Sequence, residues 1–211
     1  MTRGFQLQRR LFVEDIECRH VREEATSTFV DNMKLPVHRW FRFSAGFSAE
    51  WVRNTIKGSG VSQPHVLDPF AGSATTLLAA ESVGAKSMGL EAHPFIARIA
   101  QAKLAWRSDP ETYLVKAKAL RERSLGITPE TASYPPLIHK CYDDDTLGKL
   151  DALRQALDES DDAGDATKLV WLTLVSILRQ VSPVGTAQWQ YVLPRKQKSQ
   201  VGVHVTFVGK K

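Results

Sequence analysis

A carboxylate followed by a run of small residues is the first feature of the sequence that could do chemistry. Residues 65–76 read His-Val-Leu-Asp-Pro-Phe-Ala-Gly-Ser-Ala-Thr-Thr, so Asp68 closes a short apolar run and a small-residue loop leads into a predicted helix. Small side chains let a ligand approach the backbone, and the first turn of a helix offers N–H groups that no helical carbonyl accepts. Ligands of open α/β sheets bind at the carboxyl ends of strands, so we expect Asp68 and this loop to form a binding site.

The chemistry of the loop narrows the class of ligand. It has neither the G-x-G-x-x-G pattern of dinucleotide sites nor the G-K-[ST] of a P-loop, and a carboxylate at the strand end suits an amine-bearing ligand better than a phosphate. A second acid, Glu91, ends the next apolar segment, where a carboxylate can accept both hydroxyls of a ribose. The two acids together indicate an adenosine-type ligand that carries an amine at its other end, a description that S-adenosyl-L-methionine meets.

The predicted elements around these acids alternate between strand and helix. We expect strands at 65–68 and 87–91, and helices at 48–57 (with Ser48 as N-cap), 75–83 and 94–106. This order is the start of a doubly wound α/β sheet. The remainder is richer in helices, with helices at 110–125, 146–157 and 166–181, a loop at 133–137, and candidate strands at 188–193 and 201–208.

A family resemblance is carried by residues 68–76. Their sequence, D-P-F-A-G-S-A-T-T, resembles the D-P-F-x-G-S-G-T-T cofactor loop of DNA methyltransferases that modify the amino groups of cytosine (N4) or adenine (N6). Glu91, with His93-Pro94 after it, is similar to the ribose-binding acid of that family. Residues 37–48 are similar to the segment that forms a wall near the cofactor methionine.

The resemblance covers residues 37–106 and implies a Rossmann-like class I methyltransferase sheet that binds S-adenosyl-L-methionine. The cofactor site that it implies comprises Phe43, Ser44, Ala45, Asp68, Pro69, Phe70, Ala71, Gly72, Ser73, Thr75, Thr76, Glu91 and His93.

The sequence departs from the family pattern at two places. Ala74 stands where the family has glycine, and its methyl group would clash if the backbone there required a positive φ. The family also catalyses with a [DNS]-P-P-[YFW] motif, which holds the target amino group and stacks on the flipped base. No such tetrapeptide occurs here, because the one Pro-Pro pair, in residues 133–137 (S-Y-P-P-L), has neither the polar first residue nor the aromatic fourth.

We therefore expect an incomplete Rossmann-like sheet with a helix-rich C-terminal half. The predicted parts are an N-terminal segment at 1–36, a cofactor-binding portion at 37–108 and a helical region at 109–211. We interpret the chain as the N-terminal part of a longer methyltransferase or as a truncated product, inactive alone in either case. A non-catalytic nucleic-acid-binding or regulatory module, and an RNA or small-molecule methyltransferase, are the alternatives.

Composition and charge limit the class of protein and the partners that this chain could have. With 43% apolar and 24% charged residues the chain has the composition of a globular protein, and it has a net charge of +5. Residues 166–211 carry seven bases and no acid, a stretch that could meet DNA phosphates. Two distant cysteines and the lack of a signal peptide or long apolar run favour a cytoplasmic protein without a membrane segment. We interpret the acids of residues 143–145 as helix-capping residues rather than metal ligands.

Overall fold

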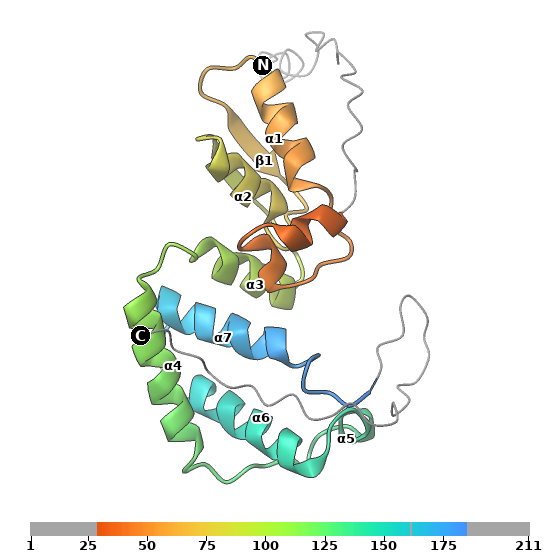
Figure 1. Ribbon diagram of the computed structural model, residues 1–211, viewed down its shortest axis with the longest axis vertical. Helices are drawn as coiled ribbons and strands as arrows, with labels where there is room; N and C mark the ends of the chain where they lie inside the picture. The colour runs from red at the N-terminus through yellow and green to blue at the C-terminus, as the bar shows by residue number, and fades with distance from the viewer. Residues whose placement is uncertain (1–28, 161, 185–211) are drawn as a thin grey trace, which may run out of the picture.

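The computed structural model describes residues 29–160 and 162–184, which form a small α/β region at one end and a helical region at the other (Figure 1). The α/β region comprises the 3-10 helices η1 (Phe29–Lys34) and η2 (His38–Trp40), then α1 (Ala49–Gly58), β1 (His65–Asp68), α2 (Thr75–Ser82) and β2 (Lys86–Gly89). It is followed by α3 (Pro94–Leu104), α4 (Pro110–Ser124), α5 (Pro136–Cys141), α6 (Asp144–Asp158) and α7 (Asp165–Ile177).

The sheet of the described residues has two parallel strands. β1 pairs with β2 so that Leu67 lies opposite Met88 and Asp68 lies opposite Gly89. A parallel pair needs a crossover connection, and here α2 crosses over and packs on both strands. Val66 faces the cluster that α1 and α2 form over one side of the sheet, whereas Leu67 and Met88 on the other side are 63% and 65% exposed.

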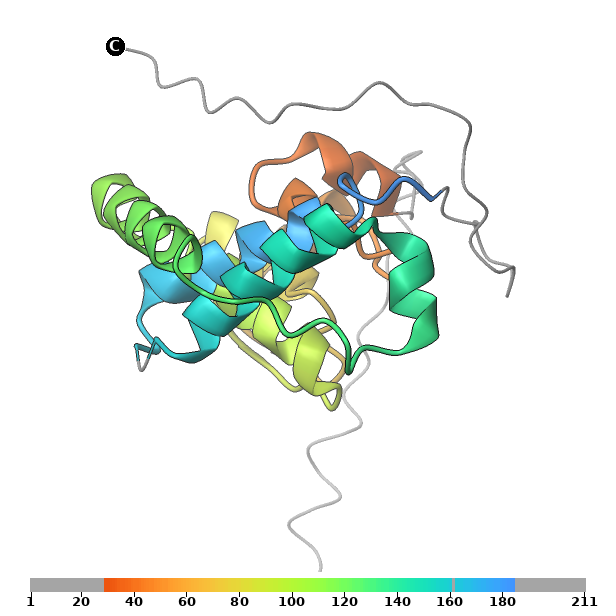
Figure 2. The same cartoon turned by 90° about the horizontal axis from the view of Figure 1, so that it is seen from below.

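The helical region has its own apolar core. α4 packs against α6 and α7, and α3 packs against α7, as the view from below shows (Figure 2). The buried members of this core are Ile99, Ala102, Leu120, Ala156, Leu157, Trp171 and Leu172. Because Ile99 belongs to this core and the neighbouring Ala100 to a cluster around the loop after β1, α3 joins the two regions.

Local capping explains where several helices begin. The Ser48 hydroxyl accepts the Trp51 N–H at 3.3 Å, which confirms the predicted N-cap of α1. The Asp143 carboxylate accepts the Thr146 N–H at 2.8 Å, which confirms its predicted role as a capping residue.

Several predicted boundaries are wrong. The helix predicted at 94–106 ends at Leu104, and the one predicted at 146–157 begins at Asp144. β2 ends at Gly89 rather than at residue 91, and Glu91 therefore lies two residues past the strand. Beyond Asp68 the chain turns into the loop, where the Ala71 N–H donates to the Leu90 carbonyl at 2.8 Å. α5 begins at Pro136, inside the predicted loop 133–137, since proline is well suited to the first turn of a helix. α7 ends at Ile177 instead of residue 181.

The described residues thus form a helix-rich α/β structure with a small parallel sheet. A larger Rossmann-like sheet and the three-part division of the chain stay predictions. The predicted strands at 188–193 and 201–208 lie outside the described residues, as does much of the basic stretch 166–211. Across residues 29–160 and 162–184, no helix has both the length and the apolarity needed to cross a bilayer.

Candidate cofactor site

β1 places Asp68 at the carboxyl end of the sheet. Its Oδ1 accepts the Phe70 N–H at 3.0 Å, whereas its Oδ2 is buried and has no hydrogen-bond partner among the described residues. A buried carboxylate oxygen without a donor is costly, so this atom is suited to accept a hydrogen bond from a ligand. Asp68 is not the cap of the following helix, because the N-cap of α2 is Ala74.

The loop after Asp68 has a backbone that only small residues permit. Gly72 has a φ of 52°, and a Cβ added there would lie 2.8 Å from Cε1 of Phe43. Glycine is therefore required twice, for its positive φ and for the close approach of the aromatic ring. Ala71 to Thr76 are all buried, whereas Phe70 projects from the loop with 85% of its surface exposed.

Ala74 takes the positive φ that the family's glycine would permit, with φ at 69°. A left-handed conformation costs a residue with a Cβ about 1–2 kcal/mol. The Ala74 methyl group is fully buried in a cluster with Val37, Leu78 and Ala100, and burial of one such group offsets about 0.8 kcal/mol. The loop thus keeps the glycine-type backbone with alanine in place, and the methyl group has room.

Glu91 joins the loop to the start of α3. Its Oε2 accepts the Gly72 N–H at 2.9 Å, and its Oε1 accepts the His93 N–H at 2.8 Å. Each carboxylate oxygen has a second lone pair that could accept a hydroxyl. His93 is the N-cap of α3 but makes no side-chain cap bond, and its exposed ring lies edge-on to Phe95.

The structure brings most of the predicted site residues together. Phe43 contacts the loop at Gly72, and the loop contacts Glu91. Ser44 and Ala45, by contrast, lie in an exposed turn closed by the Gly46 N–H on the Phe43 carbonyl, and no hydrogen bond joins them to the loop in the described structure.

Lys103 is a residue of this site that the sequence interpretation missed. It is only 2% exposed, and its Nζ donates to the carbonyls of His38 at 3.0 Å and Phe41 at 3.2 Å, and to the Ser73 hydroxyl at 3.5 Å. Burial lowers the pKa of Lys103 to about 8. The available signal was its position on the apolar stripe of α3, one turn after Ile99.

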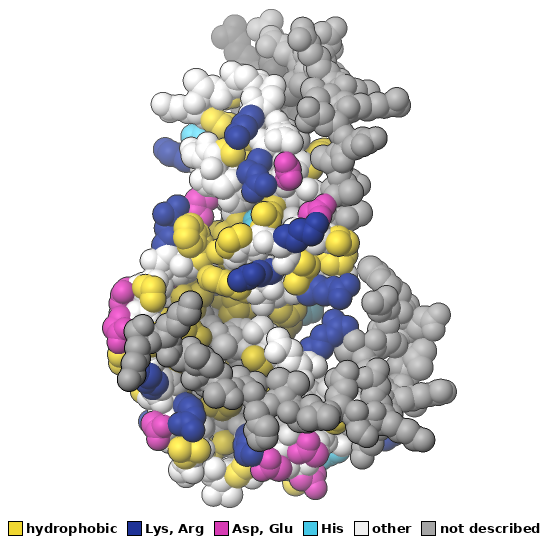
Figure 3. Space-filling view, in the orientation of Figure 1, with side chains coloured by type: hydrophobic (Ala, Val, Ile, Leu, Met, Phe, Trp, Pro, Cys, Tyr) yellow, Lys and Arg dark blue, Asp and Glu magenta, His cyan; other side chains and the backbone are white. Residues whose placement is uncertain are grey.

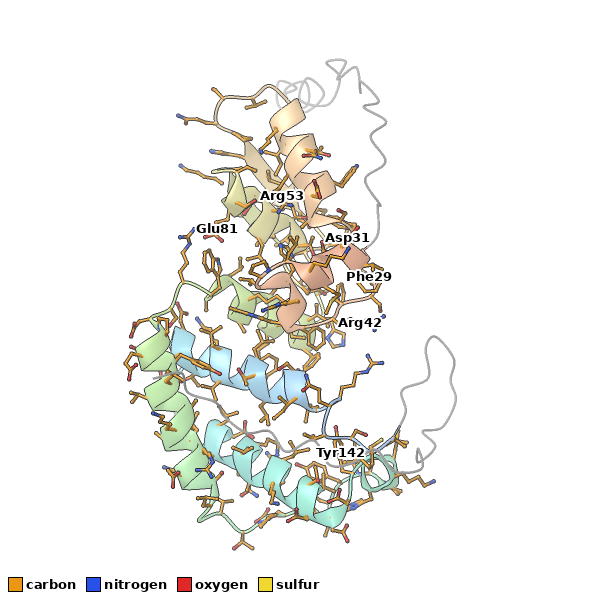
Figure 4. All side chains as sticks on the ribbon, viewed as in Figure 1. Phe29, Asp31, Arg42, Arg53, Glu81 and Tyr142 are labelled. Atoms are coloured by element: carbon orange, nitrogen blue, oxygen red, sulfur yellow. The ribbon has the colours of Figure 1, made fainter. Side chains whose placement is uncertain are left out.

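His38 lies beside this lysine in an equally closed environment. It is 8% exposed, and its pKa is lowered to about 4 by burial first, and then by the positive charges of Lys103 and Arg53. Arg53 comes from α1, and Figure 4 shows it near α2. A small cavity of about 10 Å³ adjoins His38, Phe43, Ser73 and Lys103, with room for about one water.

Two arginine side chains near the site lie over aromatic rings. Apolar, Lys and Arg side chains cluster over the middle of the molecule, where the two regions meet (Figure 3). The guanidinium carbon of Arg42 lies 5.6 Å from the centroid of the Phe29 ring (both labelled in Figure 4), and that of Arg98 lies 4.2 Å from the Trp171 ring. These are cation–π distances.

A larger cavity lies away from the loop. It has a volume of about 390 Å³ and shares no residue with the loop 69–76. Its lining is mostly apolar and aromatic, and consists of Trp40, Trp106, Ser108, Pro110, Tyr113, Leu169, Leu172, Thr173 and Ser176.

A comparison with known families agrees with the resemblance that the loop carries. Residues 15–102 match the family described as DNA methylase, which comprises N6 and N4 methyltransferases. The match includes Asp68, the loop and Glu91. The resemblance to the amino-group DNA methyltransferases is therefore confirmed for this N-terminal part of the chain.

Curated relatives agree with the family match. The chain is 42% identical over 64 residues to the type II methyltransferase M.BsoBI of Geobacillus stearothermophilus. The aligned segment covers 30% of this chain and 13% of that protein. The chain is 35% identical over 68 residues to the type II methyltransferases M.AvaI of Nostoc sp. (strain PCC 7120) and Anabaena variabilis, with 32% of this chain and 14% of each protein covered. The chain thus spans only a small fraction of the length of these relatives. No solved structure matches it significantly.

Proposed function

We propose that this chain is the cofactor-binding part of an S-adenosyl-L-methionine-dependent methyltransferase that acts on an exocyclic amino group of adenine or cytosine in DNA. The observation that carries the proposal is the buried Oδ2 of Asp68, which has no hydrogen-bond partner among residues 29–160 and 162–184 and lies next to a loop that Glu91 holds from its other side. The family match and the names of the relatives support the class of reaction.

The residues of the site fit this cofactor. An ammonium group would supply the donor that Asp68 Oδ2 lacks, and the free lone pairs of Glu91 would accept the two ribose hydroxyls. The small residues of the loop admit the ligand to the backbone, with the Phe43 ring packed beneath Gly72. When bound, S-adenosyl-L-methionine supplies an electrophilic methyl group on its sulfonium.

The part of the reaction that concerns the target base has no counterpart in this sequence. No [DNS]-P-P-[YFW] tetrapeptide occurs in the 211 residues. The loop is also open, since Phe70 is 85% exposed and Leu90 is 57% exposed. This chain would therefore bind the cofactor, and a different polypeptide segment, one that contains a [DNS]-P-P-[YFW] motif, would bind the base.

Titration calorimetry with S-adenosylhomocysteine tests the proposal. We expect the wild-type chain to bind, and Asp68→Asn and Glu91→Ala each to weaken binding at least about tenfold, which corresponds to about 1.4 kcal/mol. Glu81→Gln is the matched control, because Glu81 is a part-exposed acid on α2 that bonds to Trp106 and Arg107 away from the loop. Absence of binding by the wild type, or equal binding after Glu91→Ala, would contradict the proposal.

The missing tetrapeptide favours one alternative, a nucleic-acid-binding module that keeps the loop but does no chemistry. This alternative predicts DNA binding that neither S-adenosylhomocysteine nor Asp68→Asn changes, with no heat of binding for the cofactor analogue. The same set of variants therefore separates the two functions.

A further inference from the structure

Lys103 holds two segments that are far apart in the sequence. Its acceptors at His38 and Phe41 are 65 and 62 residues away, and the third, Ser73, belongs to the cofactor loop. An ammonium group has three N–H donors, so these three acceptors account for all of them. None of the three acceptors is a carboxylate, so neutral oxygen atoms alone stabilise the buried charge.

The segment that Lys103 holds is the one that carries the aromatic wall. Two residues after Phe41, the Phe43 ring lies against Gly72 of the loop. One ammonium group thus bonds to both sides of the Phe43–Gly72 contact, to the wall through the Phe41 carbonyl and to the loop through Ser73.

Backbone strain lies on both sides of the same contact. Val37, with φ at 63°, and Ala74, with φ at 69°, are the non-glycine residues of positive φ in the described structure, and both belong to one apolar cluster. Such a conformation is unusual for a β-branched residue and persists only where surrounding contacts enforce it. The bond from Lys103 to the carbonyl of His38, directly after Val37, is one such contact.

We propose that Lys103 is a positioning residue of the cofactor site, whose ammonium group holds residues 38–43 against the loop 69–76 and thereby sets the affinity for the cofactor. This inference rests on the proposed function, because it concerns the same cofactor. Lys103 itself does not contact the ligand in this arrangement. It acts through Phe43 and Ser73.

His38 on η2 and Arg53 on α1 are the titratable groups that interact electrostatically in this part of the described structure. With a pKa of about 4, His38 is uncharged at neutral pH. Loss of one proton from the ammonium group leaves two N–H donors for three acceptors and turns a lone pair toward an oxygen atom. Deprotonation of Lys103 should therefore loosen the hold on the wall and lower the cofactor affinity.

Two substitutions and a matched control test the inference at pH 7. Calorimetry with S-adenosylhomocysteine should show binding at least about tenfold weaker for Lys103→Met, and within about threefold of wild type for Lys103→Arg, which keeps the charge. Lys149→Met, which removes a lysine whose side chain is 72% exposed, should bind like the wild type. Thermal melting of each variant separates loss of affinity from loss of fold.

A pH profile serves as the second measurement if Lys103→Met fails to fold. The ratio of the wild-type affinity to that of Lys103→Arg should fall as the pH rises through about 8, because arginine stays protonated. Titration of the ligand's own amine affects both proteins equally and cancels in the ratio.

Equal affinity of folded Lys103→Met and wild type, or a ratio that does not change with pH, would overturn the inference and leave the proposed function standing. A wild-type chain that binds no S-adenosylhomocysteine would instead contradict the proposed function, and the positioning role with it.

Discussion

At Gly72 the backbone, an aromatic ring and a carboxylate meet within a single residue. The φ of 52° and the Phe43 ring both exclude a side chain, and the N–H donates to Glu91. We expect Gly72→Ala to lower the free energy of unfolding by about 1–3 kcal/mol and to weaken binding of S-adenosylhomocysteine, because the added Cβ would displace the ring. Chemical denaturation and calorimetry measure the two effects.

Gly58→Ala is the control for this substitution. A Cβ added at Gly58 meets nothing within 4 Å, and the residue lies at the end of α1. The free energy of unfolding of the Gly58→Ala protein should therefore not fall below that of the wild type. Equal effects of the two substitutions would show that the space at Gly72 is not what demands glycine.

The buried His38 makes the fold sensitive to acid. Its pKa is about 4 in the folded protein against a usual 6.5, so between these values the unfolded chain binds more protons than the folded one. The free energy of unfolding should therefore fall as the pH drops from 6.5 to 4, by about 1.4 kcal/mol per unit from this group.

Denaturation curves at pH 7, 6, 5 and 4.5 measure this slope. His38→Gln cannot take up a proton and should be less sensitive over the same range. A slope that His38→Gln leaves unchanged would mean that other groups cause the loss of stability.

At the scale of the elements, the buried carboxylate of Asp151 on α6 joins this helix to the segment that precedes α5. The Asp151 side chain accepts the Glu130 N–H at 2.7 Å, the Tyr134 hydroxyl at 2.6 Å, and side-chain N–H groups of Arg154 and Gln155. Burial alone would raise the pKa of Asp151, but these hydrogen bonds lower it well below the usual range.

We expect Asp151→Asn to lower the free energy of unfolding by about 2–3 kcal/mol, because an amide cannot accept all four donors and leaves Arg154 without its buried partner. Asp145→Asn removes an acid from the same helix whose side chain is 75% exposed, and should cost less than about 1 kcal/mol. Urea denaturation of the two variants gives both values. Similar costs would contradict the anchoring role of Asp151.

For the molecule as a whole, the described residues combine the loop of the candidate cofactor site with a helical region that has its own apolar core. The sequence lacks the tetrapeptide that would hold the base. We expect the chain alone, given S-adenosyl-L-methionine with a labelled methyl group and unmethylated DNA, to transfer no more label than Asp68→Asn does. Transfer well above that of the variant would show that other residues of this chain replace the motif.

Prediction from sequence succeeded where the interaction is local. The caps at Ser48 and Asp143 involve residues three positions apart, and β1 has the predicted bounds 65–68. The prediction for β2 was wrong at its end, because the length of a strand depends on its partner as well as on its own residues.

By itself the sequence determined the chemistry that the loop can offer: an acid at a strand end, small residues before a helix, and a second acid after the next strand. Only the tertiary structure decided that Asp68 Oδ2 is buried without a donor and that Lys103 holds the wall to the loop. The physical reason is that burial and the pairing of polar atoms depend on which distant segments pack together. The partners of Lys103 lie more than sixty residues away along the chain, beyond the reach of any local pattern.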